Sequence, residues 1–155
     1  MRTALAFALA FVAMSASADV SVKIDRFTGS TTYGTKLRPV YSHLAPIVTA
    51  TKGADGKLSI TIVLMGAFEN WTYLQCHDTH WLLDGKPINL PPALHHGEVG
   101  DGMVIEDIIQ KVPDLQTLGE FASASTVEWE VCNDQGQIGD ANLADLRDLY
   151  GKLKQ

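Results

Sequence analysis

Hydrophobic and polar positions alternate along much of the chain, most clearly over residues 58–65. Leu58, Ile60, Ile62 and Leu64 share one parity, and Ser59, Thr61, Val63 and Met65 share the other. A period of two places successive side chains on opposite faces of a β-strand, so this segment is predicted to be a strand with one buried face. We expect the fold to be organised around residues 57–90, with the strands of that stretch paired to one another.

Shorter alternating segments predict further strands. They are residues 20–24, 31–33, 47–51, 71–77, 81–83, 88–90 and 126–132. The pairs Asp55-Gly56 and Asp84-Gly85 lie between such segments and favour tight hairpins, because Asp-Gly readily adopts the positive φ that these turns require. Residues 93–102 and 133–139 are rich in glycine or polar side chains and are predicted to be irregular.

Apolar residues recur at helical spacing in two segments, a short one over residues 115–122 and a longer one over residues 143–153 at the C-terminus. Residues 103–112 fit one face of a helix, yet five of the ten are β-branched, which favours a strand, so the pattern leaves this choice open. Together the elements predict an α+β fold: an antiparallel sheet of six to eight strands, open to strong curling, with the short helix and the C-terminal amphipathic helix packed on it.

The N-terminal residues have the pattern of a cleaved signal peptide. Arg2 precedes an apolar run over residues 4–14, and small residues occupy positions 15–18. Cleavage after Ala18 would leave residues 19–155 as a single domain that begins at Asp19; the alternative is an N-terminal membrane anchor. The leader indicates a bacterial protein that is periplasmic or secreted.

The charge balance disfavours two classes of partner. The formal net charge is −6, and loss of Arg2 with the leader makes it −7. Nucleic acids and anionic membranes require clustered positive charge, and Lys and Arg form no run longer than a pair. We therefore expect no nucleic acid and no stable membrane anchoring.

Cys76 and Cys132 are the two cysteines of the chain. In an exported protein, a single pair of cysteines predicts a disulfide bond. The alternative is a reactive or metal-bound thiol.

Three short segments carry a resemblance to known proteins. They are residues 24–29 (IDRFTG), 82–85 (LLDG) and 122–129 (ASASTVEW), followed by the terminal helix. In this order they resemble a class of small exported bacterial α+β proteins that has no agreed activity. In that class the segment before the short helix is usually a strand, so the resemblance implies a strand over residues 103–112. The chain differs at Trp129, where the class often has a basic residue, and the cysteine pair is not general to it.

The histidines are the one candidate for a metal site. His77 and His80 lie close in sequence, His95 and His96 follow downstream, and imidazoles beside a carboxylate such as Asp78 suit zinc or copper. No H-E-x-x-H spacing occurs, and neighbouring histidines point apart in an extended chain. We therefore expect no metal or other cofactor, with these four histidines as the fallback ligands.

No catalytic motif is evident. The chain lacks a G-x-S-x-G turn, and residues 97–102 lack the lysine of a phosphate-binding loop. Glu128 and Glu130 would share one face of a strand at a separation that could suit glycoside chemistry, but a solvated polar face explains them more simply. We predict that the protein is not an enzyme.

Aromatic residues give the remaining hypothesis. If residues 71–77 are a strand with Thr72, Leu74 and Cys76 toward the core, Trp71 and Tyr73 occupy the opposite face. Either a helix covers that face, or these residues, with Trp81, present a partner surface. The sequence thus predicts an exported, non-catalytic binding or inhibitor-like module that acts through a surface on another protein or an envelope component. The alternative is a histidine-based zinc or copper protein or metal-dependent enzyme.

Overall fold

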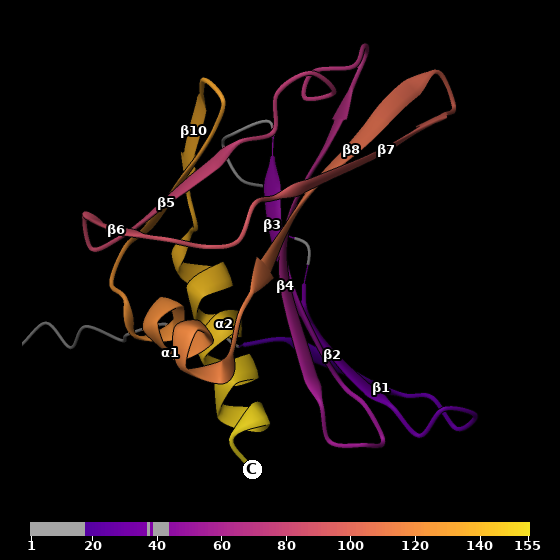
Figure 1. The fold of residues 1–155 in the computed structure, drawn as a ribbon, viewed down its shortest axis with the longest axis vertical. Helices are drawn as coiled ribbons and strands as arrows, with labels where there is room; N and C mark the ends of the chain where they lie inside the picture. Colours follow the sequence, from indigo (N-terminus) through magenta and orange to yellow (C-terminus); the bar gives the residue numbers. More distant parts are fainter. Residues whose placement is uncertain (1–17, 37, 39–43) are drawn as a thin grey trace, which may run out of the picture.

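A computed structural model describes residues 18–36, 38 and 44–155, and within them the chain folds into two antiparallel sheets and two helices (Figure 1). Sheet A has the strand order β1-β2-β3-β4-β8-β7, and sheet B has the order β10-β9-β5-β6. Sheet A comprises β1 (Val20–Ile24), β2 (Thr31–Thr35), β3 (Ala45–Lys52), β4 (Leu58–Phe68), β7 (Leu94–Gly100) and β8 (Met103–Val112). Sheet B comprises β5 (Thr79–Leu83), β6 (Lys86–Ile88), β9 (Val127–Val131) and β10 (Asp134–Gln137), and the helices are α1 (Leu115–Ser123) and α2 (Asp140–Leu153).

The α+β class is confirmed, with the C-terminal helix in place. Sheet A has six antiparallel strands and is not closed, which agrees with the predicted sheet of six to eight strands, whereas the second sheet of four strands was not predicted. Residues 57–90 pair with one another only in part: β5 pairs with β6, as expected, but also with β9, and β4 pairs with β3 and β8 in the other sheet. The leader predicted at residues 1–18 lies outside the described residues except for Ala18.

Residues 69–78 explain why the strands of residues 57–90 belong to two different sheets. They form bends and irregular chain rather than the predicted strand over residues 71–77. The backbone N–H groups of Thr72 and Tyr73 donate to the side chain of Glu106, so they find their acceptors there and not in a neighbouring strand. We call this segment the crossing loop, because it carries the chain from sheet A to sheet B.

Hairpins account for the remaining differences. The turns at Asp55-Gly56 and Asp84-Gly85 are confirmed, and the strand over residues 103–112 is confirmed as β8. The segment expected to be irregular at residues 93–102 is instead β7, joined to β8 by Asp101 and Gly102 at φ 53° and 79°. Pairing of β10 with β9 likewise converts most of residues 133–139 into strand.

One hydrophobic core unites the elements. Alternate residues of β3, β4 and β8 face the helices, and α2 lies against β1 and β2 while α1 lies against β8 and α2. Sheet B contributes Trp81 and Trp129, and the ring of Phe121 on α1 packs edge-on against Trp81 at 5.5 Å. Each such side chain stabilises the fold by about 1.5–3 kcal/mol relative to an exposed one. Within the described residues, no helix is long and apolar enough to cross a membrane.

Candidate functional site

The face of sheet A that points away from the helices carries a row of aliphatic side chains. Ile47, Val63, Ile109 and Leu94 lie opposite one another on β3, β4, β8 and β7. They occupy the parity opposite to the core residues of the same strands, so they line the outer face. Leu94 is 55% exposed, and the other three are half-buried by their neighbours.

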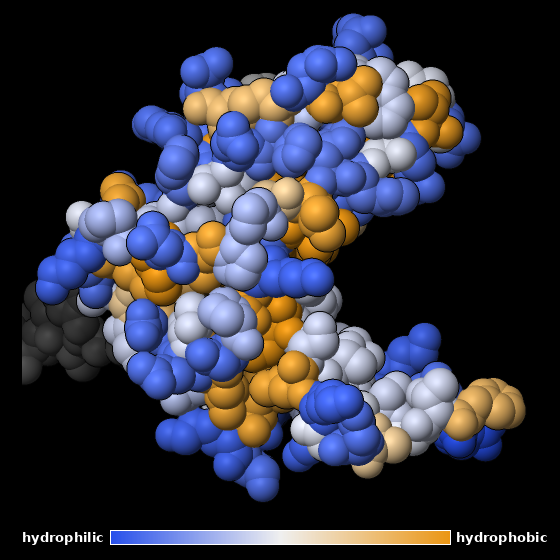
Figure 2. Space-filling model, viewed as in Figure 1, coloured by the Kyte–Doolittle hydropathy of each residue, from blue (hydrophilic) through white to orange (hydrophobic). Residues whose placement is uncertain are grey.

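Adjacent positions widen this row into a patch. Met65 on β4 and Ile105 on β8 have the same outward parity and are also half-buried. We call these six residues the outer patch: Ile47, Val63, Met65, Leu94, Ile105 and Ile109. Figure 2 shows that the molecule is hollowed on the side away from the helices, between the β7–β8 hairpin and the β1–β2 hairpin. Both helices lie on the other side of sheet A (Figure 1), so neither covers this patch.

Asp107 lies within the outer patch, opposite Met65 and His96 in the register. Burial raises the pKa of Asp107 above its ordinary value of 3.8, with the nearby imidazole of His96 opposing the rise. Its Oδ1 atom is buried and accepts no hydrogen bond within the described part of the chain. Such an acceptor costs stability when it is left without a donor. The buried, unpaired oxygen of Asp107 therefore lowers the free energy of unfolding of the isolated protein.

Replacing Asp107 by leucine should stabilise the protein by about 1 kcal/mol at pH 7, because it removes an unsatisfied acceptor and continues the aliphatic patch. The raised pKa means that the folded state binds the proton more tightly than the unfolded state, so the wild type loses stability as the pH rises from about 4. The gain from the substitution should accordingly be larger at pH 7 than at pH 3.5. Urea unfolding at both pH values measures the gain, and either the same gain at both pH values or a loss of stability at pH 7 would contradict this account.

The inner face of sheet A holds a buried carboxylate that anchors the crossing loop. Glu106 on β8 is fully buried, and it accepts hydrogen bonds from the backbone nitrogens of Thr72 at 2.7 Å and Tyr73 at 2.9 Å. A third hydrogen bond, also of 2.9 Å, joins it to the Nε2 atom of His95. Three hydrogen-bond partners satisfy a carboxylate well, so the burial of Glu106 is accounted for by its role in holding the crossing loop.

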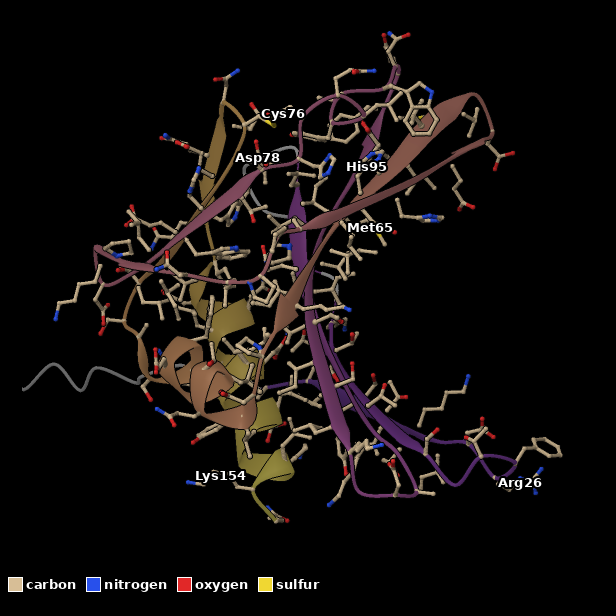
Figure 3. The ribbon with its side chains drawn as sticks, in the orientation of Figure 1. Arg26, Met65, Cys76, Asp78, His95 and Lys154 are labelled. Atoms are coloured by element: carbon tan, nitrogen blue, oxygen red, sulfur yellow. A yellow bond between two sulfur atoms is a disulfide. The ribbon has the colours of Figure 1, made fainter. Side chains whose placement is uncertain are left out.

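The four histidines of the fallback metal site do not come together. His95 faces inward and its ring stacks on that of His77, with centroids 5.9 Å apart (Figure 3). His96 faces outward beside Asp107, and His80 lies on sheet B opposite Glu130. Among residues 18–36, 38 and 44–155, no three His, Cys, Asp or Glu side chains are placed to hold a metal ion.

The aromatic residues proposed as a partner surface do not form one. Tyr73 and Trp81 are each 2% exposed and belong to the core, whereas Trp71 is 42% exposed above Gly97 and the ring of His95. The hydroxyl of Tyr73 donates to Asp134 at 2.6 Å, and burial raises the pKa of Tyr73. The prediction that Trp71 and Tyr73 share one face was wrong because residues 71–77 do not form a strand.

The disulfide between Cys76 and Cys132 is present, with the sulfurs 2.05 Å apart. It joins the crossing loop to the residue that follows β9, and Cys76 lies near the start of β5 (Figure 3). Neither cysteine is therefore available as a reactive or metal-bound thiol.

The outer face of sheet B bears a shallow groove that contains Glu128 and Glu130. His80 and Leu82 line it from β5, and Gln135 lines it from β10. The amide of Gln135 donates to Glu130. Glu128 is exposed, as expected for a solvated polar face, and the groove offers no nucleophile beside a base.

Comparison with known proteins finds no match among protein-family models, curated proteins or solved structures. The outer patch is an aliphatic row across four strands that neither helix of the described chain covers, and it was not predicted from the sequence. The signal was present, since Val63 and Met65 on β4 and Ile105 and Ile109 on β8 are apolar residues at outward positions of these strands.

Proposed function

We propose that this protein is a non-catalytic binding module that holds a protein partner on the outer patch. The observation that supports this is the aliphatic row across four strands on a face that neither helix of the described residues covers. Contiguous exposed apolar area on a monomeric domain marks an interaction surface. Strands buried on one face only normally carry polar residues on the other, and here aliphatic side chains form a continuous row between the polar positions Thr49, Thr61 and Asp107.

The chemistry of the patch points to a protein rather than a glycan. Its members are aliphatic, with one methionine, and such surfaces suit apolar side chains, whereas sugars stack on aromatic rings. The unsatisfied oxygen of Asp107 needs a donor from the partner. The partner is therefore a protein segment that offers aliphatic side chains together with one N–H donor or cation.

The setting is the cell envelope or the medium. The leader pattern of residues 1–18 and the Cys76–Cys132 disulfide both support export, since disulfides persist in oxidising compartments. The acidic net charge also fits a module whose partner presents a cation to Asp107.

Site-directed photo-crosslinking in cells that express the full chain tests this function. A crosslinking side chain placed at Leu94 or Ile47, near the two ends of the row, should capture the same protein. The same probe at Val99, which is 67% exposed on the opposite face of β7, should not capture it, and neither should a probe at Leu82 on sheet B. Val99 is the matched control because it tests the same strand at similar exposure.

A second variant tests whether the crosslinks depend on the patch. Leu94→Arg should reduce capture by a probe at Ile47 at least about tenfold, because it places an unpaired cation in the apolar interface. Val99→Arg should leave that capture unchanged. Equal capture from both faces of β7, no capture from the outer patch, or capture of a second copy of this chain alone would overturn the proposal of a distinct protein partner.

A further inference from the structure

A second site lies on the opposite side of the molecule, where α2 meets β1. Asp145 on α2 is fully buried, and the guanidinium of Arg38 binds it through two hydrogen bonds of 3.0 Å. The same carboxylate accepts a third hydrogen bond of 2.8 Å, from the backbone nitrogen of Asp19 to its Oδ1 atom. The side chain of Asp19 is paired separately with Lys36 at 3.2 Å.

Two independent observations meet at Asp19. The small residues at positions 15–18 predict peptidase cleavage between Ala18 and Asp19, which makes the nitrogen of Asp19 the new terminus. The structure places that same nitrogen, and not its neighbour's, on a buried carboxylate. Ala18 and Asp19 are both exposed, so the bond between them is open to a peptidase.

We propose that Asp145 is a receptor for the processed N-terminus, and that the α-ammonium of Asp19 forms a partly buried ion pair with it in the mature protein. The export peptidase supplies the cleavage: water adds across the Ala18–Asp19 peptide bond, the leader leaves with a new carboxylate on Ala18, and the freed amine of Asp19 takes up a proton. This site is separate from the outer patch and does not depend on it.

A charge-assisted hydrogen bond to Asp145 favours the ammonium over the amide that precedes it, while the four facing side chains balance one another in charge. Before cleavage the nitrogen of Asp19 is a neutral donor with one N–H, and after cleavage it carries three N–H donors and a full positive charge. The facing charged groups are Asp145, Arg38, Lys36 and the carboxylate of Asp19, two anions and two cations. Asn142, one helical turn before Asp145, has a buried Oδ1 atom without a donor in the described chain, so an acceptor stands on the same side of α2.

Three preparations of one sequence test the proposal. The first begins at Asp19, the second retains Ala18 in front of it, and the third begins at Asp19 but is acetylated on its α-nitrogen. Ordinary α-amino groups lose their proton near pH 8, and one held as an ammonium loses it only at higher pH. The terminus of the first preparation should therefore react with an amine reagent at pH 7 at least about tenfold more slowly than the terminus of the second. The acetylated preparation should melt at a lower temperature than the first at pH 7, because it has the hydrogen bond without the charge.

Two variants complete the design. Asp145→Asn in the chain that begins at Asp19 should restore rapid labelling, and Asp148→Asn on the same helix, whose partner is Lys152, should not. If Asp145→Asn fails to fold, the comparison of the three preparations still decides the matter because it changes no side chain. Equal labelling rates for the first two preparations, or a mature terminus other than Asp19 in the protein recovered from cells, would overturn the proposal.

Discussion

Replacing Glu106 by alanine should lower the free energy of unfolding by about 3–5 kcal/mol. The change removes one acceptor that serves three donors: the backbone nitrogens of Thr72 and Tyr73, and the ring of His95. Because Glu106 is fully buried, water cannot replace the lost contacts without opening the structure. The crossing loop would lose its attachment to sheet A and, with it, the position of Tyr73 in the core. Equilibrium unfolding in urea measures the effect.

Two companion variants separate the buried carboxylate from a general loss of negative charge. Glu106→Gln keeps the size and one acceptor oxygen, so it should cost less than alanine but still about 1–3 kcal/mol. Glu98→Gln on β7 removes an exposed carboxylate from the neighbouring strand and should change stability by less than about 0.5 kcal/mol. A loss below about 1 kcal/mol for Glu106→Ala would show that Glu106 does not anchor the loop.

Removing the disulfide should cost roughly 4 kcal/mol. The bond closes a loop of 56 positions, and the chain-entropy relation for a loop of that length gives this value. The double variant Cys76→Ser with Cys132→Ser tests it without leaving a lone thiol. Its free energy of unfolding should match that of the wild type in excess reductant.

The reductant also supplies the control for this prediction. It should lower the stability of the wild type and leave the double variant unaffected, since the variant has no bond to break. A wild type whose unfolding curve is the same with and without reductant would contradict the prediction. Both experiments probe attachments of the crossing loop, and their effects should not add independently because the two attachments share one segment.

The elements that could be predicted from sequence are those whose local signals agree with their final partners. Residues 58–65 alternate strictly, Asp55-Gly56 and Asp84-Gly85 supply positive φ at tight turns, and α2 has a continuous apolar stripe. The disulfide could be predicted just as directly, because two cysteines can form only one bond within the chain. The turn at Asp101-Gly102 carries the same signal but was masked by the glycines around it.

The remaining differences arise from contacts that are distant in sequence. The crossing loop alternates like a strand, yet a carboxylate more than thirty residues away takes its N–H groups. β10 forms because its residues pair with the edge of β9, and the local sequence of residues 134–137 gives no sign of this pairing. The outer patch was missed for a different reason: the apolar residues at the outward positions of β4 and β8 were not considered as a surface. For the candidate site, sequence correctly indicated that adjacent histidines diverge, and parity wrongly grouped Trp71 with Tyr73.

The position of β1 at the margin of sheet A has a consequence for handling the protein. β1 pairs with β2 on one side only, and Val22 and Ile24 are exposed along it. Such a margin can add a strand from another molecule, and Lys23 in its middle opposes this by mutual repulsion between copies. Dissolved salt shortens the Debye length and so weakens repulsion between exposed charges that lie farther apart than that length. Raising the ionic strength should therefore make concentrated solutions more prone to association along β1.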